Sequence, residues 1–303
     1  MKKKVVMLGI AVILVLCTMS FACTMGGNKV AVISLSGPIQ SESSGFLFGG
    51  SVISPQLVRS QLERAKNDIA VKAIVLQVES PGGSVAASQE ILNELERVEK
   101  PIVVSFGDLA ASGGYYISAK ADKIVALPGT LTGSIGVISE IPNLKGLFEK
   151  LGIEMEVFTA GKHKDMYAGV RELTPEEKVI MQEMIDQLYD QFVQVVADGR
   201  GLSEDKVREL ATGQLYTGVQ AKELGLVDEL GGLNKAIDLA ASLAGIEKPK
   251  VEYYKPAVPS LLSTLLGMGL QKLHTVIQVQ SLGAEGIILL ETLSNPYPQP
   301  EYQ

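Results

Sequence analysis

Apolar and helix-forming segments alternate along the first half of the chain. The apolar runs and the amphipathic stretches follow one another in the order 29–35, 54–66, 73–78, 84–100 and 101–106. The apolar runs are short and continuous, as in strands buried on both faces, and Pro55 stands where a first helical turn accepts proline. Strands that alternate with helices form parallel sheets, so we expect a mostly parallel α/β sheet through about residue 140.

The second half of the chain is predicted to be mainly helical. Thr174, Pro175 and two following glutamates are typical of a helix start. Apolar residues then recur at helical spacing, a pattern that indicates core or an oligomer interface rather than a cofactor site: Ile180, Met184, Leu188, Phe192, Val195 and Val196. Further helices are expected near 203–211, 217–224 and 233–244.

Two of the predicted strands end in turns that contain paired glycines. The first turn is Ser80-Pro81-Gly82-Gly83, and the second is Ala111-Ser112-Gly113-Gly114. Parallel strands end at one edge of a sheet, so both turns offer free backbone N–H groups there. Acyl transfer needs such donors for the developing oxyanion, which makes Gly83 and Gly113 candidates beside a nucleophilic Ser112. Two glycine turns that simply pack strands on helices are the structural alternative.

The base that would activate Ser112 is less obvious, because the chain contains only two histidines. His274 lies in an apolar C-terminal segment, where a lone histidine is more often structural. His163 stands beside Lys164 in the segment Gly161-Lys162-His163-Lys164-Asp165. A lysine acts as a base when its surroundings lower its pKa from about 10.4 toward 7–8. The residues alone leave open either base, or a pair of solvated surface lysines.

Four motifs in this order resemble one bacterial family. They are Ser-Pro-Gly-Gly (80–83), Ala-Ser-Gly-Gly-Tyr-Tyr (111–116), Thr-Gly-Ser-Ile-Gly-Val (132–137) and Gly-Lys-His-Lys-Asp (161–165). From about Asn28 to about Gly245 the chain is similar to signal peptide peptidase A (SppA), a family of membrane-anchored serine proteases with a Ser/Lys dyad. The resemblance implies an α/β fold of the crotonase/ClpP-like type, with a mostly parallel sheet and a helical C-terminal part.

The resemblance also implies a role for each candidate residue. Ser112 becomes the nucleophile and Lys164 the general base. Gly83 and Gly113 become the oxyanion-hole donors, and Ser134 orients the lysine amine. The family needs no cofactor and no metal.

The chain departs from the family pattern at two places. Glu79 stands where a small amide residue is expected, and Ala168-Gly169 replaces a more typical Ser-Pro. We expect the Glu79 carboxylate to lie near the site, where it would oppose a lowered lysine pKa.

The implied substrates are peptides, namely signal peptides that remain in the cytoplasmic membrane after preproteins are processed. The implied assembly is a homo-oligomer, a ring or dome in which neighbouring subunits share active sites. Two other functions remain open at this point: a catalytically idle membrane scaffold, and an acyl-CoA enzyme of the crotonase fold.

The N-terminus has the pattern of a membrane anchor. Three lysines precede an apolar stretch from Val5 to Cys23, so we expect residues 1–27 to form a single-pass anchor with the catalytic domain outside the cytoplasm. A cleaved signal peptide, or a lipid on Cys23, is the alternative. The protease domain is expected at 28–250, followed by an apolar segment and tail at 251–303. The formal net charge of −7 argues against a nucleic-acid partner.

Overall fold

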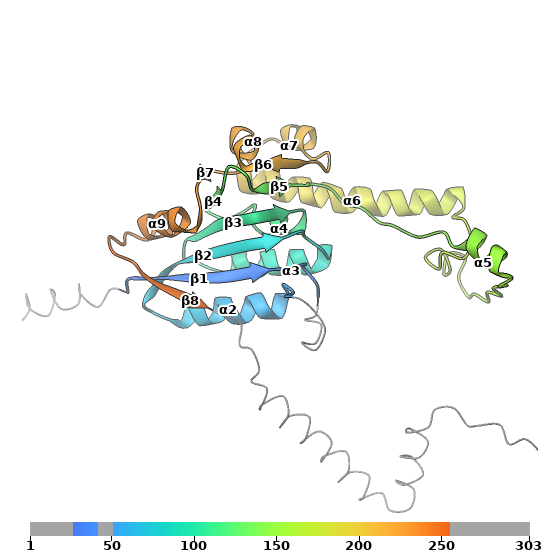
Figure 1. Cartoon of the computed structure of the whole chain (residues 1–303), viewed down its shortest axis with the longest axis horizontal. Coiled ribbons are helices and arrows are strands. Elements are labelled where there is room, and N and C mark those ends of the chain that lie inside the picture. Colours follow the sequence, from blue (N-terminus) through green and yellow to red (C-terminus); the bar gives the residue numbers. More distant parts are fainter. Residues whose placement is uncertain (1–26, 42–50, 255–303) are drawn as a thin grey trace, which may run out of the picture. The chain divides into compact units, whose positions relative to one another are not determined.

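An eight-stranded sheet organises the described part of the computed structural model, residues 27–41 and 51–254 (Figure 1). Its main path runs β6-β5-β3-β2-β1-β8, and β4 pairs with both β3 and β7. Every pairing is parallel except β5 with β6, so the predicted sheet is confirmed. The strands are β1 (Lys29–Ser36), β2 (Val71–Ser80), β3 (Ile102–Ala111), β4 (Lys123–Ala126), β5 (Leu131–Gly133), β6 (Leu215–Thr217), β7 (Glu229–Leu230) and β8 (Lys250–Tyr254).

The predicted helices lie close to where the pattern places them, whereas the pattern does not predict α5 (Lys145–Leu151). The other helices are α2 (Pro55–Asn67), α3 (Val85–Glu96), α4 (Gly113–Tyr116), α6 (Pro175–Arg200), α7 (Glu204–Leu210), α8 (Gly218–Glu223) and α9 (Leu233–Leu243). The side chains of Ser54, Thr174 and Thr217 cap α2, α6 and α8 as N-cap residues.

One helix ends earlier than expected. α3 stops at Glu96 rather than continuing through Lys100. The Lys100 amine instead donates to the carbonyls of Ala65, Lys66 and Asp68 at the end of α2, at 2.7, 3.1 and 3.0 Å. These bonds satisfy carbonyl groups that a helix end leaves without partners.

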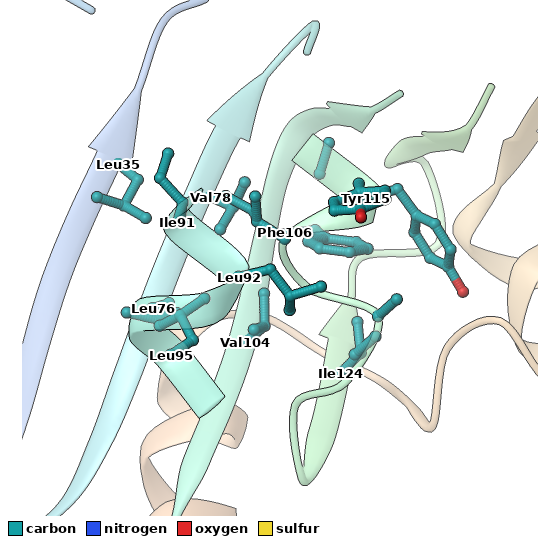
Figure 2. Close-up of a cluster of buried hydrophobic side chains, with 14 of the residues drawn as sticks. Leu35, Leu76, Val78, Ile91, Leu92, Leu95, Val104, Phe106, Tyr115 and Ile124 are labelled. Atoms are coloured by element: carbon teal, nitrogen blue, oxygen red, sulfur yellow. The ribbon is translucent and has the colours of Figure 1, made fainter. Parts of the chain in front are cut away.

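Both faces of the sheet are buried, which explains the continuous apolar runs of its strands. Ala31 and Ile33 of β1 belong to the larger core cluster, with residues of α2, α3, α4 and α6. Val30 and Val32 face the other way and pack with α9. Figure 2 shows part of the larger cluster around Phe106 of β3.

Between β5 and α6 the chain leaves the sheet as a long excursion. We call residues 138–174 the arm; it contains α5 and lies at the end of α6 that points away from the sheet (Figure 1). No residue of α5 is buried. α6 has 26 residues and is therefore about 39 Å long.

The apolar stripe of α6 meets two different environments. Near its C-terminal end Phe192 and Val196 are buried in the core, as expected. Met184, nearer the arm, is exposed within the described chain, because the helix is longer than the layer it covers. The stripe is therefore core over only part of its length.

The ends of the chain fall largely outside the described residues. The predicted anchor at 1–27 is described only at Gly27. Of the expected C-terminal segment 251–303, residues 251–254 belong to β8, which pairs with β1 and carries the sheet past residue 250. Within 27–41 and 51–254, no helix combines the length and apolar character needed to cross a membrane.

Candidate active site

Ser112 sits at a sharp junction between a strand and a helix. β3 ends at Ala111, α4 begins at Gly113, and Ser112 between them has φ 53° and ψ −121°. These angles are typical of the first central position of a type II′ turn, which normally needs glycine. A bond of 2.9 Å from its backbone N–H to the Gly133 carbonyl holds the junction. A serine in such a sparsely populated conformation is a feature of nucleophiles presented at the top of a sheet.

The upstream glycine turn packs directly on this junction. Gly82 has φ +95°, and a Cβ atom added to it would lie 2.6 Å from the Gly113 nitrogen and 2.8 Å from the Ser112 Cβ. A Cβ atom on Gly83 would lie 2.1 Å from the Ile39 carbonyl oxygen. Both positions therefore require glycine: a side chain on Gly82 would push the two turns apart, and one on Gly83 would clash with the backbone of Ile39.

Two backbone N–H groups meet beside Ser112 without a hydrogen-bond partner. A Cβ atom built on Gly113 would lie 3.3 Å from the Gly83 nitrogen, so the two residues are in close contact. Within the described part of the chain, neither the Gly83 nor the Gly113 N–H group donates a hydrogen bond. Gly113 is buried and Gly83 is exposed, so this unpaired couple is open to an incoming group and is suited to binding an anionic oxygen.

Ser134 directly follows β5, just as Ser112 directly follows the neighbouring strand β3. Ala111 of β3 and Gly133 of β5 are partners in the parallel pairing, so Ser112 and Ser134 both follow directly after paired residues. Ser134 also has a positive φ of 49°, and its backbone N–H donates to the Gln214 carbonyl at 2.8 Å. The structure therefore brings together Ser112, Ser134 and the two glycines.

A small apolar cavity of about 30 Å³ opens beside the serine. A space of this size holds at least one water molecule, so it suits a small side chain. The lining residues come from α3, α4, α6, the two turns and the segment after β5: Gly83, Val85, Ser88, Ser112, Gly113, Tyr116, Gly136, Val137, Leu188 and Phe192. The stripe on α6 identified Leu188 and Phe192 only as core or interface, because periodicity cannot distinguish a pocket wall from a core.

Lys164 does not join this group within one chain. It lies on the arm, at the far end of α6 from the sheet (Figure 1), and its side chain is exposed. Among the described residues its amine has no hydrogen-bond or ion-pair partner. His163, the other candidate base, also lies on the arm, where its Nδ1 is 3.3 Å from the Glu177 carboxylate.

Glu79 has a structural role that the sequence did not reveal. Its carboxylate accepts bonds from the backbone N–H groups of Asp108 at 2.6 Å and Leu109 at 3.1 Å. The register of β2 and β3 shifts between Val78 and Ser80, so the carboxylate supplies acceptors where the strand ladder is interrupted. Within this chain it contacts the β3 backbone rather than Lys164.

Comparisons with known proteins point to peptidases. The family model described as Peptidase family S49 matches residues 94–247, and the Clp protease model matches residues 32–132. "Putative signal peptide peptidase SppA" of Enterococcus faecium is 40% identical over 243 residues, which are 79% of this chain and 71% of that protein. Protease 4 of Haemophilus influenzae is 37% identical over 252 residues, 79% of this chain and 40% of that protein. "Serine protease SPPA, chloroplastic" of Arabidopsis thaliana is 34% identical over 253 residues, 81% of this chain and 37% of that protein.

Proposed function

We propose that this chain, which belongs to peptidase family S49 and is a serine-type peptidase, uses Ser112 as its nucleophile and Lys164 as its general base. The observation that carries the proposal is the pair of unpaired N–H groups of Gly83 and Gly113 beside a serine held in a turn conformation. In this mechanism the Ser112 Oγ attacks the peptide carbonyl while the neutral Lys164 amine takes its proton. The two N–H groups stabilise the oxyanion, and the proton passes to the leaving amine.

The base in this proposal comes from a neighbouring subunit. Lys164 is exposed and belongs to the arm, which extends away from the sheet (Figure 1). The arm also carries exposed apolar side chains: Leu147, Leu151, Ile153, Met155, Val157 and Phe158. Exposed apolar surface of this kind is typical of an interface. Contacts that repeat between identical subunits close into rings, so we propose a homo-oligomer, a ring or dome, that shares its sites between subunits.

Ser134 is proposed to orient the lysine amine. A hydroxyl both donates and accepts hydrogen bonds, so it can direct the lone pair of a neutral amine toward Ser112. Only the neutral amine accepts a proton, so we expect activity to rise with pH. No metal or cofactor takes part in this mechanism.

The proposed substrates are remnant signal peptides at the extracytoplasmic face of the cytoplasmic membrane. The name of the Enterococcus relative and the small apolar cavity beside Ser112 support this choice, because signal peptides combine an apolar core with small residues. Residues 1–27 would anchor a protease domain that begins at residue 28 and includes β8, which extends to Tyr254.

Family membership favours peptidase activity over acyl-CoA chemistry. The remaining alternative is a member of the family that serves only as a membrane scaffold. In that case Ser112 would be dispensable for the cellular role, whereas a protease needs it.

Labelling with a fluorophosphonate probe tests the dyad. We expect the wild-type protein to label, Ser112→Ala not to label, and Lys164→Ala to label at least about 100-fold more slowly because its serine has lost the base. His163→Ala is the matched control and should label at nearly the wild-type rate. Rapid labelling of Lys164→Ala together with an inert His163→Ala would assign the base to the histidine.

Mixed oligomers test whether sites are shared. Ser112→Ala and Lys164→Ala proteins are each inactive in our proposal, and co-expression should restore about a quarter of the wild-type activity if subunits mix at random in a closed ring. Demonstrably mixed oligomers without any recovered activity would mean that each subunit builds its own dyad.

A further inference from the structure

Arg171 uses its whole guanidinium group to join the arm to the start of α6. Nε and Nη2 donate to the two carboxylate oxygens of Asp165, both at 2.7 Å. Nη1 and Nη2 donate to the two oxygens of Glu177, both at 2.8 Å, and Nη1 also reaches the Glu172 carbonyl at 3.0 Å. A guanidinium has five N–H donors, and each of these five has one acceptor. Two bidentate pairs on one arginine fix its orientation, and with it that of both carboxylates.

Glu177 connects this arginine to the start of α6. Its side chain is only 1% exposed, and its carboxylate also accepts the Thr174 backbone N–H at 2.9 Å, as part of a capping box. Hydrogen bonding to Arg171 is the first cause that lowers the pKa of Glu177, so the carboxylate stays charged. The same carboxylate lies 3.3 Å from the His163 ring. A rigid helix end therefore holds Arg171 and the residue before Lys164.

The side chains on both sides of Lys164 are fixed, while its own is free. His163 contacts Glu177, Asp165 is held by Arg171, and Lys162 pairs with Glu176. In the described part of the chain, Lys164 is the only residue of the segment 162–165 whose side chain has no hydrogen-bond or ion-pair partner. A fixed backbone that presents one free amine lowers the entropy lost when the amine takes up a single catalytic position.

We propose that Arg171 is a positioning residue for Lys164: by joining Asp165 to Glu177 it fixes the segment that presents the amine to Ser112. This inference rests on the proposed role of Lys164 as the base. A lysine at position 171 would keep the charge but not the two planar pairs, because an ammonium group is a single point donor.

Arg171→Lys tests the proposal, with Arg59→Lys as the matched control. Arg59 likewise joins two carboxylates, Glu90 and Glu94, but between α2 and α3. We expect Arg171→Lys to lower kcat and the rate of fluorophosphonate labelling by about 10- to 100-fold, since small displacements of a catalytic group have effects of this size. KM, the oligomeric state and the thermal transition should stay near wild-type values, and Arg59→Lys should change none of these quantities.

Measuring the effect of Arg171→Lys in the Lys164→Ala protein as well as in the wild-type protein separates a positioning role from a general loss of structure. If Arg171 acts through Lys164, adding Arg171→Lys to Lys164→Ala should not slow labelling further. An equal loss in both backgrounds, or wild-type kcat and labelling in Arg171→Lys, would overturn the inference. If Arg171→Lys fails to assemble, Asp165→Asn provides a second test of the same contact. It should slow labelling in the same way, and a normal labelling rate would refute the positioning role of Arg171.

The two proposals can fail separately. Normal labelling of Lys164→Ala itself would remove the proposed base, whatever Arg171 does. An inactive Lys164→Ala beside a fully active Arg171→Lys would leave the dyad intact and reject only the positioning role.

Discussion

In the proposed mechanism the sheet holds the nucleophile and the oxyanion donors, whereas the arm carries the base. Around the sheet, Ser112, Ser134 and the two glycine turns are held by strand pairing and by contacts too close for any side chain on Gly82 or Gly83. On the arm, Lys164 is exposed and α5 buries none of its residues. The proposed nucleophile and oxyanion donors are thus assembled within a single chain, whereas the proposed base depends on a neighbouring subunit.

Two phenylalanines illustrate the difference in physical terms. Phe192 of α6 is 4% exposed and packs edge-on against Tyr116, with ring centroids 5.1 Å apart. Phe158 of the arm is 91% exposed in the described chain. Burial of such a side chain contributes about 1.5–3 kcal/mol, and Phe158 gains this only when another surface covers it. The arm is therefore expected to be stabilised by assembly rather than by folding.

The largest expected effect comes from breaking the arm's contacts. Phe158→Asp should dissociate the oligomer and lower peptidase activity by about 100-fold or more, while the thermal transition of the subunit changes little because the side chain is exposed. Analytical ultracentrifugation and peptide hydrolysis measure both outcomes.

The matched control for Phe158→Asp is Ile69→Asp. Ile69 is 82% exposed on the turn before β2, so the same charge is introduced away from the arm. It should leave both assembly and activity intact. A monomeric Phe158→Asp protein with full activity would contradict a site shared between subunits.

On the sheet side, the close contact of the two turns can be tested with one methyl group. Gly82→Ala should lower kcat by about 100- to 1,000-fold, the usual cost of disturbing an oxyanion donor, because the new Cβ atom would displace the Gly113 nitrogen. Gly201→Ala controls for backbone strain alone, since Gly201 has φ +64° with no atom within 4 Å of the new Cβ. Equal activity losses in both variants would argue against a specific role of the turn.

A smaller effect is expected at Ser134, between the two regions. Ser134→Gly removes the hydroxyl but tolerates the positive φ, and should reduce kcat by about 10- to 100-fold through loss of lysine orientation. Ser134→Ala adds backbone strain to the same loss, so its thermal stability should be lower than that of Ser134→Gly. Full activity in Ser134→Gly would make Ser134 an ordinary turn residue.

The smallest expected effect is a loss of stability around Arg171 at acidic pH. Arg171 is the first cause that lowers the pKa values of both Asp165 and Glu177. Carboxylates with lowered pKa values stabilise the fold fully above their unfolded values of about 3.9 and 4.3, and this contribution is lost as pH falls toward the folded values.

Hydrogen exchange can follow this loss. Amides of residues 162–177 should keep their protection at pH 5 and lose it below about pH 4, before the strands do. Glu177→Gln should reduce that pH dependence, and only the contribution of Asp165 should remain. Loss of protection already near pH 6 would contradict the assignment to these carboxylates.

The regular elements could be predicted because their causes are local. Thr174 and Pro175 mark the start of α6, and the apolar run of β2 precedes the glycine turn that the structure places beside Ser112. The roles of Arg171 and Glu79 could not be predicted. Their partners lie in irregular backbone or on a neighbouring strand, where no periodic pattern records the contact. The division of α6 into a buried and an uncovered part depends on the path of the arm, which residue periodicity does not describe.

The antiparallel pairing of β5 with β6 has a consequence for how such enzymes diverge. The bonds from Ser134 to Gln214 at 2.8 Å and from Gly213 to Ile135 at 3.1 Å bring together the two ends of the longer segment that holds the arm, α6 and α7. Doubling the length of a flexible loop whose ends are fixed costs only about 0.6 kcal/mol in closure entropy. Length changes within the arm, where no residue of α5 is buried, are therefore expected to be tolerated by the sheet, whereas α6 is held by buried residues such as Phe192 and Val196. If Lys164 is the base as proposed, such changes in the arm alter how far its amine reaches without altering the residues around Ser112.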